Sequence, residues 1–284
     1  MSDTLQSEVI NLIQKLLPQI LIAGRYAAQI QKSIAVHPAK NGMASQFSQA
    51  LTDADLSVQN FIEVCLLSSF SQYAFFGEEY ASSLNCKYFP VSSNLTVLLD
   101  PIDGTLFYKD GAPTFSVIMG IVSPEKFQAS IIFFPCLEKC YLAIAGEGTF
   151  VLTLEEMSKS CWSQQVVLNA ETNRLVAFHQ PELAAKISPK YNVVDIHRDY
   201  KKGVYCPTFE TILDGTSSAM FVSPAQFIDG MAFAFAIEQA GGYLCDLQGQ
   251  PLSRIDQTKN WIYPSALAAS SQKLAEEILS EMRK

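Results

Sequence analysis

The sequence predicts a layered α/β fold of two units, the first built on a mainly antiparallel sheet and the second alternating strands with helices. Two patterns predict this. Between residues 73 and 153, short β-rich apolar runs follow one another with turn residues between them. After residue 165, strand-like runs alternate with helical ones. Because 49% of the 284 residues are hydrophobic, the chain can also bury a large core. We expect the two units to span 1–155 and 156–284.

Helices are expected before the first sheet. Residues 4–36 carry apolar side chains at helical spacing, and Pro18 is expected to break or kink this run into two helical pieces. The segment 37–50 is rich in Pro, Gly, Asn and Ser without a sustained period, and is expected to be mobile or a hairpin. Helical spacing resumes over 53–71.

The apolar runs in the middle of the chain predict six strands: YAFFG (73–77), LTVLLD (95–100), FSVIMGIV (115–122), FQASIIFF (127–134), CYLAIAG (140–146) and GTFVLTL (148–154). In the second unit we expect strands at RLVAF (174–178), NVVDI (192–196) and GGYLCD (241–246), and helices at ETILDG (210–215), DGMAFAFAIEQAGG (229–242) and the tail 270–284.

Charge and apolar pattern exclude several classes of function. With 20 Lys and Arg against 28 Asp and Glu, the net charge is −8, so the chain lacks the basic face that nucleic-acid polymers require. Asp3 and Glu8 stand where a signal peptide would carry basic residues. The longest apolar runs are far shorter than the roughly 20 residues of a membrane span. We therefore predict a soluble cytoplasmic protein.

The cysteines indicate reduced thiols. The chain has seven cysteines, an odd number, and no CxxC pair. Cys136 and Cys140 have CxxxC spacing, but no second pair follows and no His is near. We interpret both as structural residues and not as zinc ligands.

Acidic residues lie at the ends of predicted elements instead of along solvated faces. They are Glu78 and Glu79, Asp100 and Asp103, Asp53 and Asp55, and Asp229. Each has an ordinary structural alternative, which is a solvated turn for the first two of these pairs and a helix N-cap for Asp53, Asp55 and Asp229. If they converge, carboxylates about 4 Å apart repel by roughly 4 kcal/mol at an effective dielectric near 20, so cations would have to hold them together. Oxygen donors without His or Cys favour Mg²⁺ or Mn²⁺.

The local pattern of DPIDGT, residues 100–105, supports a phosphate site. Pro101 biases Asp100 toward an extended backbone, so Asp100 is expected to end a strand while a turn returns Asp103 beside it. Gly104 and Thr105 would then begin a short helix whose backbone N–H groups can hold a phosphate.

These motifs together resemble those of the inositol monophosphatase family, the Mg²⁺-dependent, lithium-sensitive phosphatases that include the bisphosphate nucleotidases. GEE, DPIDGT and IDGMAFAFAIEQAGG occur in the order and approximate spacing of that family, and the likeness runs from about residue 50 to 250. GEE together with DPIDGT is a specific signature. The resemblance implies a layered αβαβα sandwich like that of the sugar phosphatases, with the active site between the two units.

The resemblance also implies a set of metal ligands. Glu78, Asp100 and the backbone carbonyl of Ile102 would hold the metal that activates water. Asp100, Asp103 and Asp229 would hold the metal that stabilises the leaving oxygen, as in two-metal phosphoryl transfer.

Further roles follow from the same resemblance. Thr105, hydrogen-bonded toward Asp55, would orient the nucleophilic water, and the N–H groups of Gly104 and Thr105 would bind phosphate. Glu79 would help a weaker third metal site. On the substrate side the resemblance implies Asp229, and Tyr205 is a further candidate.

Two more residues, Phe209 and His197, are candidates for the substrate mouth beside Tyr205, with ordinary core or rim as the alternative. The chain departs from the family pattern in four places. Ile228 replaces a Trp, Gln239-Ala240 replaces Glu-Ala, GVYC (203–206) replaces a small-residue segment, and Val222 replaces a Glu that contacts inositol hydroxyls. A substrate hydroxyl without its polar partner costs affinity, so these changes put inositol phosphate in question.

The resulting hypothesis is a Mg²⁺-dependent phosphomonoesterase for a small phosphorylated metabolite, acting through metal-activated water. Within that class an inositol phosphatase, a 3'(2'),5'-bisphosphate nucleotidase and a sugar or histidinol phosphatase remain open. The alternative from another class is a catalytically silent protein that binds phosphate or a partner. Family habit predicts a homodimer.

Overall fold

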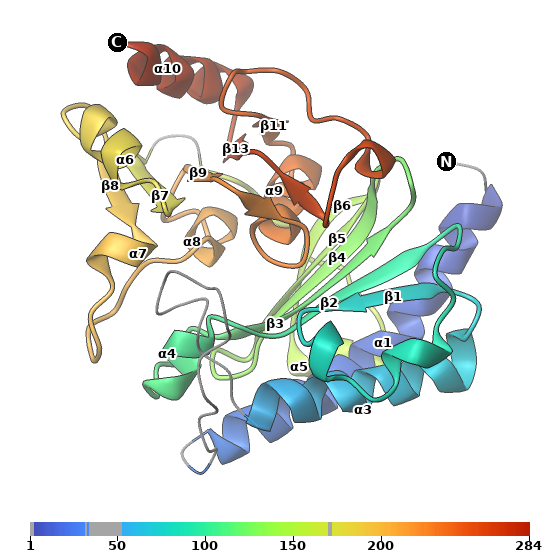
Figure 1. Ribbon diagram of the computed structural model, residues 1–284. Coiled ribbons are helices and arrows are strands. Elements are labelled where there is room, and N and C mark those ends of the chain that lie inside the picture. Colours follow the sequence, from blue (N-terminus) through green and yellow to red (C-terminus); the bar gives the residue numbers. More distant parts are fainter. Residues whose placement is uncertain (1–2, 32, 34–52, 170–171) are drawn as a thin grey trace. The chain divides into compact units, whose positions relative to one another are not determined.

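The computed structural model describes residues 3–31, 33, 53–169 and 172–284 (Figure 1). The chain divides into two compact units, of which the first comprises Met1–Leu142 with Val151–Gln164 and the second Ala143–Phe150 with Gln165–Lys284. These units differ from the expected division at 155/156, because residues 143–150 belong to the second unit. The predicted α/β class is confirmed. The segment 37–50 lies outside the described residues.

A six-stranded sheet with the order β1-β2-β3-β4-β5-β6 begins in the first unit. Its strands β1 and β2 pair in parallel, whereas β2 with β3 and β3 with β4 pair antiparallel, so the predicted antiparallel character is confirmed. Every residue of β3 and β4 is buried, which explains why both strands are mostly apolar on both faces. The strands are Ala74–Gly77, Thr96–Asp103, Ser116–Val122, Phe127–Phe134, Lys139–Ile144 and Gly148–Leu152, one for each predicted run.

Two long helices, α1 (Asp3–Ile30) and α3 (Asp53–Phe70), pack against each other and against this sheet, α1 on β4 and α3 on β2 (Figure 1). Shorter helical pieces complete the first unit. They are η1 (Tyr80–Ser82), η2 (Cys86–Tyr88), α4 (Thr105–Lys109) and α5 (Leu154–Lys159).

The predicted break at Pro18 is wrong, because α1 continues through it. Proline has no N–H, so it cannot donate the helical hydrogen bond to the carbonyl of Gln14 four residues earlier. The hydroxyl of Ser160, the residue that ends α5, donates to that carbonyl at 2.6 Å instead. A side chain distant in sequence therefore satisfies the group that Pro18 leaves without its donor.

The second unit contains a five-stranded sheet with the order β11-β13-β9-β7-β8. Strand β7 pairs in parallel with β8 and β9, and β13 pairs antiparallel with β9 and β11. A two-stranded sheet, β10 with β12, completes it. The strands β7 to β13 are Arg174–Phe178, Asn192–Asp195, Ala219–Val222, Ala225–Gln226, Tyr243–Cys245, Ile262–Tyr263 and Ala266–Ala269. The helices α6 to α10 are Pro181–Ile187, Ile196–Asp199, Glu210–Leu213, Gly230–Gln239 and Gln272–Arg283, and a short turn η3 spans Ile255–Gln257.

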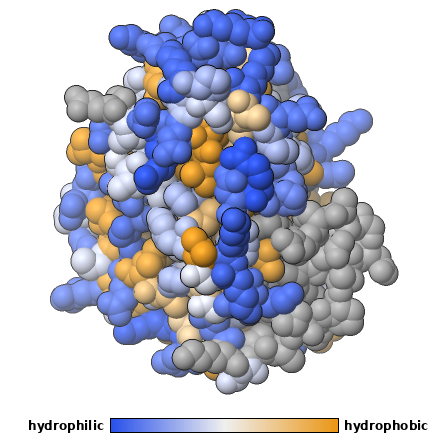
Figure 2. Space-filling model, turned by 90° about the vertical axis from the view of Figure 1, so that its left-hand side faces the viewer, coloured by the Kyte–Doolittle hydropathy of each residue, from blue (hydrophilic) through white to orange (hydrophobic). Residues whose placement is uncertain are grey.

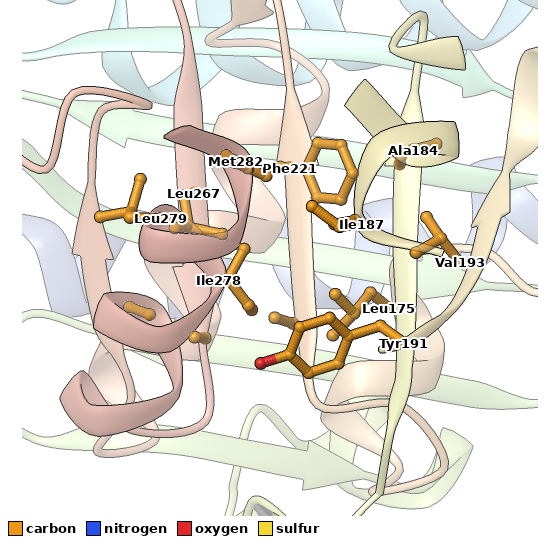
Figure 3. Packing of buried hydrophobic residues seen from close by; sticks show 14 of the residues in the cluster. Leu175, Ala184, Ile187, Tyr191, Val193, Phe221, Leu267, Ile278, Leu279 and Met282 are labelled. Carbon is orange, nitrogen blue, oxygen red and sulfur yellow. The ribbon is translucent and has the colours of Figure 1, made fainter. Parts of the chain in front are cut away.

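The core of the second unit lies between this sheet and two helices, α6 and α10. Figure 3 shows Leu175, Phe221 and Leu267 of the sheet facing Ile278 and Ile187 of the helices. An apolar residue every four positions predicts an amphipathic helix in the tail. Helix α10 confirms this, because its apolar residues Leu274, Ile278 and Met282 pack against the sheet.

The surface is mostly hydrophilic on the face that Figure 2 presents, where apolar side chains are scattered among polar ones. None of the helices in the described residues has both the length and the apolar character needed to cross a membrane. The seven cysteines are all free thiols, in line with the predicted reduced state.

Candidate functional site

The parallel pairing of β1 and β2 brings Glu78 beside Asp100. Gly77, the last residue of β1, lies opposite Leu99, and the Glu78 N–H donates to the Leu99 carbonyl at 2.9 Å. Continued by one residue, this register sets Glu78 against Asp100. Two carboxylates that are 22 positions apart in the chain therefore meet at one edge of the sheet because parallel strands end on the same side.

Strand β2 continues through Pro101 to Asp103, so the expectation that it ends at Asp100 and turns is wrong. Asp100 pairs with Ile118 and Asp103 pairs with Ser116, so three steps along β2 face two steps along β3. This one-residue bulge has a direct consequence, since Ile118 and Ser116 lie on the same face of β3. Their partners Asp100 and Asp103 therefore share a face, although residues three apart in a regular strand would not.

Asp103 is held in a partly desolvated position. Burial raises the pKa of its carboxyl to about 6, hydrogen bonds from the Ser116 hydroxyl and the Gly104 N–H oppose this rise, and the negative charge of Glu78 adds to it. The Ser116 hydroxyl donates to Asp103 Oδ2 at 2.7 Å. Ser116 was not singled out from the sequence, where its signal was a polar residue inside an apolar strand.

Three carboxylates form a compact group at the same edge. Asp55 from the first turn of α3 and the neighbours Glu78 and Glu79 each offer an oxygen, and these oxygens lie within 4.8 Å of one another. Asp55 and Glu79 are buried, with 1% and 4% of their surface exposed. At such a distance each pair of ionised groups repels by about 3 kcal/mol at an effective dielectric of about 20. A hard divalent cation fits this donor set, which contains carboxylate oxygens alone.

The segment after Asp103 folds as expected into the short helix α4, which begins at Thr105. Gly104 adopts φ +77°, and a side chain there would place its Cβ 2.7 Å from the Phe107 ring, so this position requires glycine. The Thr105 hydroxyl donates to the Ile102 carbonyl at 3.1 Å. The predicted bond from Thr105 toward Asp55 therefore has a competitor, since a hydroxyl has a single proton to donate.

Asp229 belongs to the second unit, where it occupies the N-cap position of α9. Its side chain makes no capping hydrogen bond, so helix capping does not explain this acidic residue. Ile228, which precedes it, and Val222 are apolar and buried, with 5% and 2% of their surface exposed. Val222 also packs closely on Gly230, where an added Cβ would lie 3.3 Å from its Cγ1.

The three candidates for the substrate mouth have different environments. Tyr205 is 67% exposed, whereas Phe209 is a core residue whose ring packs against Phe233. His197 stacks on His179 with ring centroids 4.2 Å apart. Phe209 therefore lies in the core, which agrees with the structural alternative to a place at the substrate mouth.

Comparison with known proteins agrees with this architecture. The inositol monophosphatase 1 of Bos taurus is 24% identical over 243 residues, covering 82% of this chain and 81% of that protein. A histidinol-phosphatase of Chlorobaculum parvum is 29% identical over 101 residues, or 36% of this chain and 37% of that protein. The crystal structure of the extragenic suppressor protein suhB from Bartonella henselae superimposes with a TM-score of 0.74 at 17% identity, covering 96% of this chain and 99% of that one. The family model named "Inositol monophosphatase family" matches residues 13–284. The chain therefore belongs to the inositol monophosphatase family, a family of metal-dependent phosphatases.

Proposed function

We propose that the protein is a Mg²⁺-dependent phosphomonoesterase that acts on a small phosphorylated metabolite. The observation that supports it most is the close group of carboxylates formed by Asp55, Glu78 and Glu79 at the edge of the first sheet. Divalent cations bound there, Mg²⁺ or Mn²⁺, would supply an activated water and stabilise charge on the leaving oxygen.

In this proposal carboxylate and carbonyl oxygens of the chain bind two cations, and Asp100 is a ligand of both. Glu78, Asp100 and the Ile102 carbonyl hold the first, and Asp100, Asp103 and Asp229 hold the second. Glu79 contributes to a weaker third site. The bulge in β2 supports the sharing of Asp100, because it aligns Asp100 and Asp103 on one face of the strand.

Thr105 and Gly104 complete the proposed machinery. The Thr105 hydroxyl, close to the Ile102 carbonyl, orients the attacking water. The N–H groups of Gly104 and Thr105 receive the phosphate oxygens, and Asp55 lies beside the Glu78 and Glu79 carboxylates to orient the same region.

For the substrate, the buried apolar residues Val222 and Ile228 argue against inositol phosphate. Val222 and Ile228 offer no hydrogen bond to an inositol hydroxyl, and an unpaired substrate hydroxyl costs about 1–3 kcal/mol. We therefore expect a substrate that places no hydroxyl against these two side chains, and a nucleotide, sugar or histidinol phosphate can meet that condition. Solved structures of one relative from Staphylococcus aureus, with TM-scores of 0.64 and 0.63 at 19% identity, are described as bound to 2'AMP and to inositol monophosphate, so this relative favours neither substrate.

A substrate panel with Mg²⁺, ranked by kcat/KM, tests this choice. It should include inositol monophosphate, a 3',5'-bisphosphate nucleotide, 2'AMP, a sugar phosphate and histidinol phosphate. Inositol monophosphate as the best substrate would contradict the proposed preference. Homodimer formation, cytoplasmic location and lithium sensitivity stay predictions that rest on the family resemblance.

The reaction class is tested with Asp103→Asn and an aryl phosphate. We expect Mg²⁺-dependent hydrolysis by the wild type and its near-complete loss in the variant, while Asp256→Asn, an exposed position paired with Arg254, keeps full activity. Full activity in Asp103→Asn would contradict the mechanism. A wild type without Mg²⁺ binding and without hydrolysis would favour the silent phosphate-binding alternative.

A further inference from the structure

Helix α3 carries a row of buried polar side chains that leads away from the candidate metal centre. Asp55, Gln59 and Glu63 follow at intervals of four residues, so they lie on one face of the helix. They are 1%, 1% and 0% exposed. Burial of an amide and two carboxylates is costly unless each is hydrogen-bonded, so their partners show why the helix keeps them.

Glu63 ties the helix to the segment that follows the candidate ligands. Its Oε2 accepts from the Ser83 hydroxyl at 2.7 Å and from the Asn85 amide at 3.0 Å. Its Oε1 accepts from Gln59 Nε2 at 2.9 Å and from the Cys86 thiol at 3.4 Å. This carboxylate therefore has donors on both oxygens, three of them from residues 83–86.

The bond from Gln59 to Glu63 sets the orientation of the Gln59 amide. An ionised carboxylate only accepts, so the NH₂ group of Gln59 must face Glu63 and its carbonyl oxygen must point the other way. That oxygen accepts from the backbone N–H of Glu79 at 3.0 Å. It also lies directly against Gly77, so a side chain at that position would force the Gln59 amide to move.

We propose that Gln59 and Glu63 are positioning residues for the candidate metal centre. Glu63 fixes the Gln59 amide, and Gln59 holds the backbone of Gly77–Glu79, so that the Glu78 and Glu79 carboxylates stay beside Asp55 against their mutual repulsion. The step from this scaffold to metal affinity rests on the proposed function. Groups that orient metal ligands typically change metal affinity 10–100-fold when they are removed.

The direct test uses the purified full chain and Mg²⁺. Gln59→Met keeps the length of the side chain but removes both hydrogen bonds, so the dissociation constant for Mg²⁺, measured by calorimetry, should rise about tenfold. At saturating Mg²⁺, kcat for an aryl phosphate should fall much less. Ile62→Val, a buried position on the same helix outside the row, is the control for a general loss of stability and should leave the dissociation constant unchanged.

A reciprocal exchange tests the pairing itself. Gln59→Glu alone sets two carboxylates against each other and should weaken Mg²⁺ binding. The double variant Gln59→Glu with Glu63→Gln restores a donor opposite an acceptor and still offers an oxygen to the Glu79 N–H, so it should return to within about threefold of wild type. No recovery in the double variant would overturn the proposed orientation.

Hydrogen exchange without metal separates this inference from the proposed function. In peptides covering 77–85, Gln59→Met should exchange faster than wild type and faster than Ile62→Val. A wild type that binds Mg²⁺, with Gln59→Met binding equally well, would overturn the positioning role alone. A wild type that binds neither Mg²⁺ nor Mn²⁺ would overturn both proposals, whatever the exchange rates.

Discussion

Two buried aspartates on strands, Asp100 within β2 and Asp195 at the end of β8, show how differently one residue type is used in the two units. Asp195 is fully buried, and its two oxygens accept the backbone N–H groups of Gln180 at 2.7 Å and Arg198 at 3.0 Å. It therefore links β7 and α7 as a structural residue. Asp100 instead lies at an edge where Glu78 and Asp103 bring further negative charge.

The difference shows that position on a strand does not identify a functional carboxylate. The hydrogen-bond donors and charges around the carboxylate do. Asp195 accepts two backbone N–H groups, one on each oxygen. Asp100 accepts the backbone N–H of Ile102 at 3.0 Å, and lies where Glu78 and Asp103 add like charges that a cation would offset. The following substitutions should separate the two cases.

Asp100→Asn should have the largest effect on activity. It removes a proposed shared ligand, so we expect kcat/KM for an aryl phosphate to fall about 10³-fold. Since the change also removes a repelling charge, the melting temperature without metal should stay equal or rise. Steady-state kinetics and thermal unfolding check both points, and a large drop in melting temperature with retained activity would contradict the assignment.

Asp195→Ala should behave in the opposite way. Two buried N–H groups would lose their acceptor, which should lower the free energy of unfolding by about 3 kcal/mol. The dissociation constant for Mg²⁺ should not change. Urea unfolding and calorimetry test the pair of expectations, and a selective loss of Mg²⁺ affinity would show that Asp195 is not purely structural.

Ser116→Ala should have a smaller effect. The Ser116 hydroxyl donates to Asp103 Oδ2, and its loss leaves that carboxylate less well oriented. We expect the affinity for Mg²⁺ to fall about tenfold, so that the Mg²⁺ concentration for half-maximal activity rises by the same factor. Ser68→Ala, an exposed serine on α3, serves as the control. Equal half-activating concentrations in both variants would argue against an orienting role.

The smallest expected effect is a pH dependence in the second unit. Burial lowers the pKa of His179, the neighbouring His197 lowers it further, and Asp195 opposes this shift. Because the folded pKa lies below the unfolded value of about 6.5, the unfolded state binds the proton first, and stability falls as the pH drops below about 6.5. Above that pH His179 contributes no slope.

His179→Asn is the matching variant, since asparagine tolerates the φ of +58° found there. Urea unfolding between pH 5 and 8 should show that the free energy of unfolding falls less steeply with decreasing pH in the variant than in wild type. The difference between the two slopes should correspond to at most one proton. Identical slopes would mean that His179 does not carry the dependence. The proposed metal residues of the first unit are unchanged in this variant.

The apolar patterns predicted most of the fold. RLVAF was placed at 174–178 and β7 spans Arg174–Phe178, because a continuous apolar run bounded by polar residues has few alternatives to a buried strand. Pro18 was misread because its compensation comes from Ser160, which no local pattern reveals. Residues 143–150 group with the second unit, which depends on contacts that no local pattern reveals.

The candidate site was predictable in its residues more than in its geometry. GEE and DPIDGT indicated the carboxylates, but the bulge that aligns Asp100 with Asp103 depends on how β2 pairs with β3. In the sequence, Asp53 and Asp55 stand out at the start of helix α3, but no role is predicted for Gln59 or Glu63. The signal in the sequence is polar residues at four-residue spacing, Asp55, Gln59 and Glu63, and the structure shows that all three are buried.

The central claim is that the carboxylates of the first unit serve a divalent cation that hydrolysis requires. Its most direct test is aryl phosphate hydrolysis by the wild type, first stripped with a chelator and then titrated with Mg²⁺. The account predicts no activity after stripping and a saturable return of activity with Mg²⁺. Undiminished hydrolysis in excess chelator, or none at any concentration of Mg²⁺ or Mn²⁺, would contradict it.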